Sequence, residues 1–232
     1  ALNLPEQSVE FPPQLYVFGL AADLEARQMA RAAFGEDRRS VTVIAAGDML
    51  SKRIQQAFGE EWAALGGVAA KHLAFTGANP SEVRDALRRQ APNVVFLAMN
   101  SRDARLLKPF LNTDLPTYAT SQIYAGSGSL QKYHDLNGVQ FVDMPWLLQP
   151  DHLAVMVYPR SPSPLAADME RLYALGIDAW RLAWQLHQSP PGVPFSLDGV
   201  TGHLTLDVRS HQINRDGTRA QFSEGEAVVL AP

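Results

Sequence analysis

The 232-residue chain contains no cysteine. This absence excludes disulfides, zinc–thiolate sites, iron–sulfur clusters and cysteine nucleophiles. It is typical of an oxidising compartment, where a stray thiol is a liability, although cysteine-free cytosolic domains are also common. A chain of this length forms one large domain or two small ones, and it buries enough surface to need no metal or disulfide for stability.

Long apolar runs and an excess of basic charge are also missing. No stretch of about 18 apolar residues occurs, so the sequence predicts no membrane-spanning helix. The net charge of −4 argues against nucleic-acid binding, which usually needs a basic face. The chain begins at Ala1 with no signal-peptide pattern. We therefore expect a fragment or a mature chain, with any targeting sequence upstream.

Motifs of the common enzyme classes are absent. There is no P-loop, no GxGxxG after a strand and no GxSxG elbow. Ser129 and Lys132 match the SxxK pattern of serine acyltransferases, but the companion SDN and KTG motifs are lacking. We interpret that pair as part of a solvated loop or a short helix. Because the acidic residues are scattered and suggest no carboxylate pair, we predict no enzymatic activity and no cofactor.

The histidines do not predict a metal site. No two of them have the i, i+4 spacing of HExxH. His203 and His211 could approach each other across a hairpin, but they have no acidic companions. We therefore predict no bound metal. The six are His72, His134, His152, His187, His203 and His211.

The first half of the chain alternates short apolar runs with amphipathic helical segments. These units recur about every 25–30 residues between 15 and 120, which predicts an α/β fold with a doubly wound, mostly parallel sheet. Helices are expected to begin near Asp23, Leu50, Asn79 and Asn100. The expected strands are 15–20, 40–46, 71–75, 93–99, 117–120 and 139–144.

The pattern changes after residue 144. Five prolines punctuate a long connection, and a helix is predicted over 166–188. Apolar side chains lie nearly all round it, which predicts a buried helix. The tail is expected to form a strand at 202–208, a turn at 214–217 and a strand at 227–230.

Polar side chains follow several of the predicted strands. The carboxyl ends of parallel strands meet at one edge of a sheet, where such folds bind ligands, and helix N-termini aimed there favour anions and amides. Two interpretations remain open: a site for a small polar ligand, or side chains that only cap helices. These residues, called the rim below, are Asp23, Asp48, Asn100, Ser101, Ser121 and Gln122.

The segment YATSQIY at 118–124, followed by DMPW at 143–146, is the most specific pattern in the chain. Further segments of the same kind are 15–20, 93–105, 115–117, 138–142 and 172–179. Through these segments nearly the whole chain resembles the C-terminal domain of the LppC/LpoA family of outer-membrane lipoproteins, which activate class A penicillin-binding proteins.

The resemblance implies a lobe of a type I periplasmic binding protein with a partial second lobe. On this basis lobe two spans 14–148. Residues 149–232 hold a crossover, the buried helix and a hairpin of a partial lobe one, plus a returning strand. About a hundred residues of lobe one would be missing. We expect the aromatic face of helix 166–188 to be covered by a neighbouring copy or by folding back onto the sheet.

The resemblance also implies a function. It indicates a non-enzymatic periplasmic regulator of peptidoglycan synthesis, which activates a class A penicillin-binding protein through protein–protein contacts. Its only membrane contact would be a lipid anchor upstream, in the outer membrane. The alternative is a solute-binding protein that holds an amino acid or a peptidoglycan fragment in the cleft between the lobes.

Overall fold

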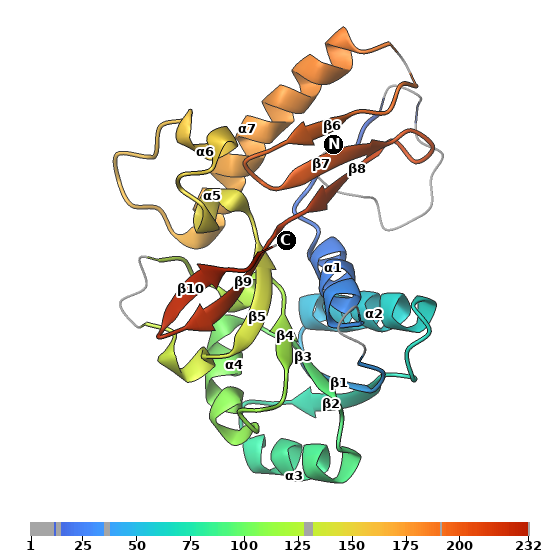
Figure 1. Ribbon diagram of the computed structural model, residues 1–232, viewed down its shortest axis with the longest axis vertical. Helices are drawn as coiled ribbons and strands as arrows, with labels where there is room; N and C mark the ends of the chain where they lie inside the picture. Colours follow the sequence, from blue (N-terminus) through green and yellow to red (C-terminus); the bar gives the residue numbers. More distant parts are fainter. Residues whose placement is uncertain (1–11, 13–14, 35–37, 128–131, 191, 232) are drawn as a thin grey trace. The chain divides into compact units, whose positions relative to one another are not determined.

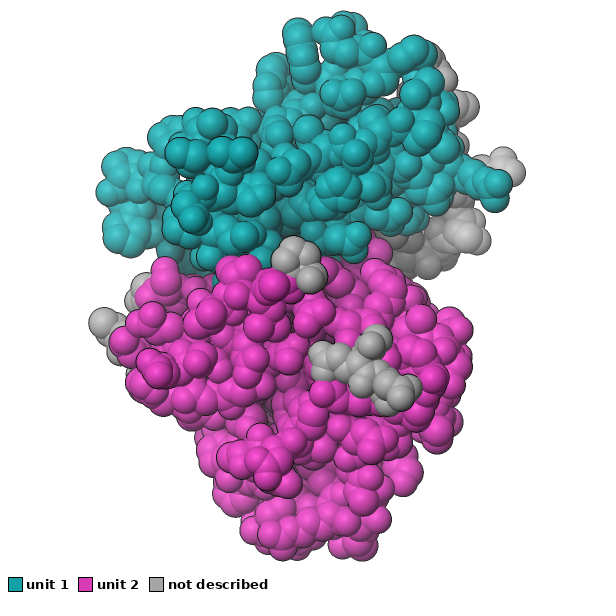
Figure 2. Space-filling model, viewed as in Figure 1, with its two compact units in different colours: residues 1–21, 144–218 teal, residues 22–143, 219–232 magenta. Residues whose placement is uncertain are grey.

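The computed structural model describes residues 12, 15–34, 38–127, 132–190 and 192–231. The chain divides into two compact units (Figure 2): unit 1 comprises 1–21 and 144–218, and unit 2 comprises 22–143 and 219–232. These boundaries differ from the expected 14–148 and 149–232. Residues 15–21 and 144–148 fold with unit 1, and the C-terminal strands join unit 2. Among the described residues, no helix is both long and apolar enough to cross a bilayer.

Unit 2 is built on a seven-stranded sheet with the order β10-β9-β5-β4-β3-β1-β2 (Figure 1). Strands β1 to β5 run parallel, whereas β9 and β10 form an antiparallel pair. This confirms the predicted α/β, mostly parallel sheet. Its strands are β1 (Val41–Ala46), β2 (Lys71–Phe75), β3 (Val94–Ala98), β4 (Thr117–Ala119), β5 (Val139–Asp143), β9 (Thr218–Ser223) and β10 (Glu226–Val229).

Helices cover both faces of this sheet. Right-handed crossovers place α2 on one face and α3 and α4 on the other, and Figure 1 shows α4 across the sheet from α1 and α2. Short 3₁₀ turns connect the later strands. The helical elements are α1 (Ala22–Phe34), α2 (Met49–Ala64), α3 (Pro80–Gln90), α4 (Ser101–Leu107), η1 (Lys108–Phe110), η2 (Ser121–Ile123) and η3 (His134–Leu136).

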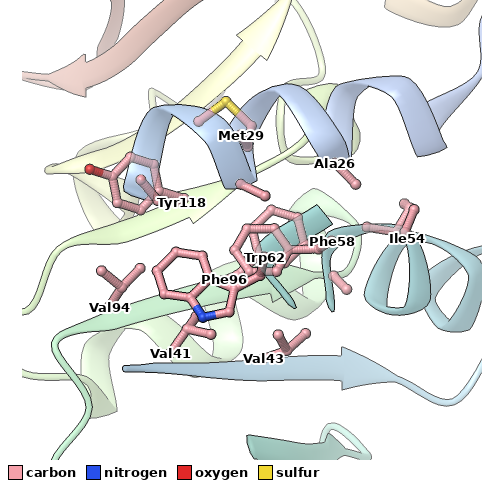
Figure 3. Close-up of a cluster of buried hydrophobic side chains, with 14 of the residues drawn as sticks. Ala26, Met29, Val41, Val43, Ile54, Phe58, Trp62, Val94, Phe96 and Tyr118 are labelled. Carbon is pink, nitrogen blue, oxygen red and sulfur yellow. The ribbon is translucent and has the colours of Figure 1, made fainter. Parts of the chain in front are cut away.

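The main core of unit 2 lies between the sheet and the pair α1 and α2. Every residue of β1 and β3 is buried, as expected for a strand with helices on both sides. Phe58 of α2 stacks on Phe96 of β3, with ring centroids 4.0 Å apart, and Trp62 stacks on Phe58 (Figure 3). Met29 completes the cluster from α1.

The ends of α2 follow directly from its sequence. Asp48 caps the N-terminus, because its carboxylate accepts the Ser51 backbone N–H at 2.8 Å. At the C-terminus Gly66 adopts φ +84°, which costs glycine little. The Gly66 N–H donates to the Ala63 carbonyl and the Gly67 N–H to the Trp62 carbonyl, which together form a Schellman motif.

Unit 1 joins a long helix to a three-stranded antiparallel sheet with the order β6-β7-β8. Leu175 and Leu182 of the helix pack against Leu204, Leu206 and Ile213 of the sheet. The elements are α5 (Pro145–Leu148), α6 (Leu153–Met156), α7 (Ala167–Gln188), β6 (Ser196–Asp198), β7 (His203–Asp207) and β8 (Gln212–Asp216).

Two predicted elements are wrong. Residues 15–20 are not a strand of the large sheet; Val17 makes a single bridge to Gln212 in unit 1. The expected turn at 214–217 is largely strand β8. The chain instead turns at 208–211, where His211 takes φ +55°. The strand expected at 227–230 is confirmed as β10.

The prediction of a buried helix at 166–188 is also wrong. Within unit 1 the α7 side chains of Trp180 and Trp184 are 73% and 58% exposed. The small three-stranded sheet covers only one side of the helix, and apolar residues continue round the other side.

Candidate functional site

The rim gathers at the carboxyl edge of the unit 2 sheet. Strands β1, β3 and β4 pair in parallel, with Ile44 opposite Leu97 and Leu97 opposite Ala119. The loops that leave these strands therefore emerge at the same edge, as the sequence predicted. Five of the six rim residues lie in one of these loops or in the first turn of the next helix, whereas Asp23 lies in the first turn of α1, which follows no strand of this sheet.

Asp48 and Asn100 are helix caps. Asp48 accepts hydrogen bonds from the Ser51 N–H at 2.8 Å and from the Ser51 hydroxyl at 2.6 Å. The hydroxyl bond is the main reason that the pKa of Asp48 lies below its ordinary value. Asn100 accepts the Asp103 N–H at 3.0 Å. The capping interpretation therefore accounts for the hydrogen bonds of both residues.

Asp23, in the first turn of α1, pairs with a residue of α2. Its Oδ2 accepts a hydrogen bond from the Arg53 guanidinium at 2.9 Å. Its other oxygen, Oδ1, is buried and has no hydrogen-bond partner among the described residues. A buried acceptor without a donor is costly, so Asp23 has capacity left for a ligand or a water molecule.

Ser121 depends on a residue that the sequence did not reveal. Its backbone N–H donates to Glu25 Oε2 at 3.0 Å. Glu25 lies on α1 and is only 4% exposed. A buried glutamate is rare unless it is paired, and its position in an amphipathic helix gave no signal of burial. The neighbouring Thr120 is fully buried, and its hydroxyl has no partner among the described residues.

Ser101 and Gln122 complete the rim. Ser101 is the first residue of α4, Gln122 lies in η2, and both are half-buried. The rim therefore offers carboxylates, hydroxyls and amides, which can hydrogen-bond a small polar molecule. Among the described residues, no group of three His, Asp or Glu side chains could hold a metal ion.

The other residues that the sequence singled out as possible catalytic or metal-binding groups do not come together in the described part of the chain. Ser129 lies outside the described residues, and Lys132 forms an exposed ion pair with Glu226 at 2.8 Å. His203 lies on β7 opposite Asp216. His211 lies in the turn at the far end of the same hairpin. The two histidines therefore do not meet.

Comparison with known proteins identifies the family. Residues 1–225 match a family described as "LppC putative lipoprotein". The chain belongs to the LppC family. It is 28% identical to "Penicillin-binding protein activator LpoA" of Edwardsiella ictaluri, over 99% of this chain and 40% of that protein. It thus spans about 40% of the length of the curated relatives that it matches.

Two solved structures share the fold of this LppC chain. One is the "LpoA (YraM) C-domain from Haemophilus influenzae, a regulator of PBP1A", with 25% identity, a TM-score of 0.81, and coverage of 99% of this chain and 73% of that one. The other is from Chromobacterium violaceum and is described as "a putative branched-chain amino acid ABC transporter". It has 40% identity, a TM-score of 0.85, and coverage of 95% and 71%.

The residues that carry the LppC resemblance are mostly buried. Tyr124 packs against Phe222, with ring centroids 6.1 Å apart. In unit 1 Trp146 is fully buried, and its indole N–H donates to Glu170 at 2.6 Å. The Arg160 guanidinium lies 3.8 Å from the centroid of the Trp146 ring. These LppC positions therefore report the fold of the two units more than a ligand site.

Proposed function

We propose that this LppC chain is part of a non-enzymatic regulator of peptidoglycan synthesis, which activates a class A penicillin-binding protein through protein–protein contacts. The match to penicillin-binding protein activators over 99% of the chain carries this proposal. The Haemophilus influenzae relative, described as a regulator of PBP1A, matches over the same range.

The same family match supports a location. The family is described as lipoproteins, so we propose that the protein acts in the periplasm, held at the outer membrane by a lipid upstream of these residues. The absence of cysteine from the chain is compatible with that oxidising compartment.

A regulator that activates a synthase by contact must bind the active state of the synthase more tightly than the inactive state. A regulator shifts the equilibrium between an inactive and an active synthase only as far as it binds the active state more tightly. Two orders of magnitude in affinity are worth about 2.7 kcal/mol.

Binding to the cognate synthase tests the proposal. The full-length lipoprotein would be immobilised, and the synthase ectodomain passed over it. We expect saturable binding, and the same synthase passed over an unrelated periplasmic lipoprotein serves as the control. If the synthase shows no saturable binding to the full-length lipoprotein, the proposed function is contradicted.

A solute-binding role is the second candidate. The Chromobacterium violaceum structure, described as "a putative branched-chain amino acid ABC transporter", is 40% identical to this chain. At the rim, the Thr120 hydroxyl and Asp23 Oδ1 are buried without partners among the described residues. Buried polar atoms normally have a hydrogen-bond partner. A bound amino acid or peptidoglycan fragment would supply the missing partners of these two oxygens.

Thermal-shift measurements test this second role. A ligand at a hundred times its Kd stabilises the folded state by about 2.7 kcal/mol. Amino acids and muropeptides would be screened against the wild type and Thr120→Val, which keeps the side-chain shape and removes the hydroxyl. A shift in the wild type that shrinks in the variant supports a rim ligand. If no amino acid and no muropeptide shifts the melting temperature of the wild type, a rim ligand of these classes is excluded.

A further inference from the structure

A groove of unit 2 lies at the edge of the sheet opposite the rim. It is lined by α3, which lies at the bottom of Figure 1, and by residues from the segments 91–93 and 109–116. These two segments lead into β3 and β4, so the groove lies at the amino ends of those strands. Its volume is about 940 Å³. We call it the α3 groove, and all of its lining belongs to the stretch 84–116 of unit 2.

Two arginines give the α3 groove a positive charge. Arg84 and Arg88 are four residues apart, which places them on the same side of α3, and both line the groove. Arg84 Nε donates to the neighbouring Asp85 at 3.0 Å, which leaves four of the five guanidinium N–H groups of Arg84. Arg88 is exposed and makes no hydrogen bond or ion pair within the described part of the chain. Asp114 is the one acidic residue in the lining, so the groove is positive on a chain whose net charge is −4.

Two asparagines add hydrogen-bond donors to the α3 groove. Asn93 Oδ1 accepts hydrogen bonds from the N–H and the hydroxyl of Ser40, at 3.3 and 2.8 Å. Asn112 Oδ1 accepts the Asp114 N–H at 3.1 Å. Because each oxygen already has a partner, each side chain keeps its NH₂ group to donate, and neither NH₂ group has a partner among the described residues. The groove therefore presents mainly donors, which suit a ligand rich in carboxylate and carbonyl oxygens.

Much of the remaining lining is apolar and stiff. Phe110 lines the groove and is 36% exposed, so part of its ring is open to a ligand. Three prolines lie in the same lining, and the ring of each one fixes its backbone φ. Segments of this kind lose little conformational entropy when a ligand binds. The three are Pro92, Pro109 and Pro116.

The size and charge of the α3 groove narrow the class of ligand. Its volume lies near the upper end of the range for small-molecule pockets, which leaves room for several residues of an extended chain. Two arginines against one aspartate are too few charges for nucleic acid, which needs a broad basic face. An acidic peptide segment matches the lining. Its carboxylates would pair with the guanidinium groups, its carbonyls would accept from the asparagine NH₂ groups, and an apolar side chain would pack on Phe110.

We propose that the α3 groove docks an extended acidic segment of the class A synthase. This inference rests on the proposed function, because it names the surface through which the lipoprotein contacts the synthase. Arg84 and Arg88 hold the carboxylates of that segment. Since the groove and the rim lie at opposite edges of the unit 2 sheet, a ligand at the rim and the synthase do not compete for the same residues.

Reversal of one charge tests the docking in the binding measurement with the full-length lipoprotein and the synthase ectodomain. Arg88→Glu should raise the Kd about tenfold or more, because it replaces an attraction for a carboxylate with a repulsion. Arg89→Glu is the matched control. It makes the same charge change at the next residue of α3, which is exposed but does not line the groove, and it should change the Kd much less.

Asp114→Asn should act in the opposite direction. The variant removes the one acid of the lining, so the Kd should fall about two- to threefold. The Kd of the wild type should rise as salt is added, because salt screens exposed charges, and it should rise less steeply in Arg88→Glu. Since Arg88 and Asp114 are both exposed, both variants should keep the wild-type melting temperature, which separates docking from folding.

The possible results distinguish this docking site from the proposed function. If the synthase binds the wild type, Arg88→Glu and Asp114→Asn with one Kd, the α3 groove is not the docking site, and the proposed function stands. If the synthase does not bind the wild type, both the function and the docking are contradicted. Muropeptides also carry carboxylates, so they would be added to the wild type and to Arg88→Glu. A melting-temperature shift that only the wild type shows would assign the groove to peptidoglycan and overturn its assignment to the synthase.

Discussion

At the scale of single residues, the polar contacts at the rim are of two kinds: short-range helix caps and contacts between residues far apart in the sequence. Asp48 and Asn100 accept the free N–H groups of the helices that follow them. Glu25 accepts the N–H of Ser121. Short-range capping was predictable, because it needs only the residues within one turn. The Glu25 contact spans 96 residues of sequence, so no local pattern could show it.

The pKa of Asp48 tests the capping assignment. The hydrogen bond from the Ser51 hydroxyl is the main reason that the pKa of the Asp48 carboxyl lies below its ordinary value. Such a group stabilises the fold above its unfolded pKa and loses that contribution as the pH falls through its lower folded pKa. We expect Ser51→Ala to raise the pKa of Asp48 towards its ordinary value in an NMR titration of the carboxyl carbon. Ser81→Ala, at an exposed helix start, should leave it unchanged.

Gly67 should not tolerate a side chain. A Cβ atom there would overlap the indole ring of Trp62, which is fully buried. Overpacking of this kind costs about 1–3 kcal/mol, which is roughly 2–10 °C in melting temperature for a domain of this size. Gly47→Ala is the matched control, because its Cβ meets nothing within 4 Å. Equal melting temperatures for the two variants would contradict the structure.

At the scale of elements, the sequence predicted the parallel strands well. The runs at 40–46, 93–99 and 139–144 are apolar and rich in β-branched residues, and each is a buried strand. The segment 15–20 is also apolar, but Val17 is its only β-branched residue, and it extends no sheet beyond one bridge there. Composition shows that a segment is buried, and only tertiary contacts decide whether it pairs.

Helix α7 shows the limit of the hydrophobic pattern. Its apolar residues extend nearly all round, which is normally a sign of burial. The pattern does not show which residues cover the apolar sides of the helix. In unit 1 the sheet covers Leu175 and Leu182, whereas Trp180 and Trp184 are left to solvent.

Asp178 joins α7 to the turn before β7. Its carboxylate is fully buried and accepts hydrogen bonds from the N–H groups of Val200 and Thr201 and from the Thr201 hydroxyl, at 2.6–3.1 Å. In Asp178→Asn an amide NH₂ would replace one acceptor and face a donor. We expect a loss of about 2–4 kcal/mol in urea denaturation. Exposed Asp151→Asn should change stability little, and similar midpoints for both variants would refute this role.

At the scale of the whole molecule, the sequence predicted the α/β class but not the division of the chain. Unit 2 closes with residues 219–232, and unit 1 combines 15–21 with 144–218. Neither unit is continuous in sequence, so a single boundary near residue 148 could not describe them. The family resemblance rested on buried residues such as Trp146 and Tyr124, which explains why it identified the fold without identifying a site.

The most direct test of the central claim is the rate of glycan polymerisation by the cognate class A synthase, measured with and without the full-length lipoprotein. We predict that the wild type raises the rate saturably, and that the stability-neutral variants Gly47→Ala and Asp151→Asn do so equally. A synthase rate that does not change at saturating lipoprotein would contradict the account.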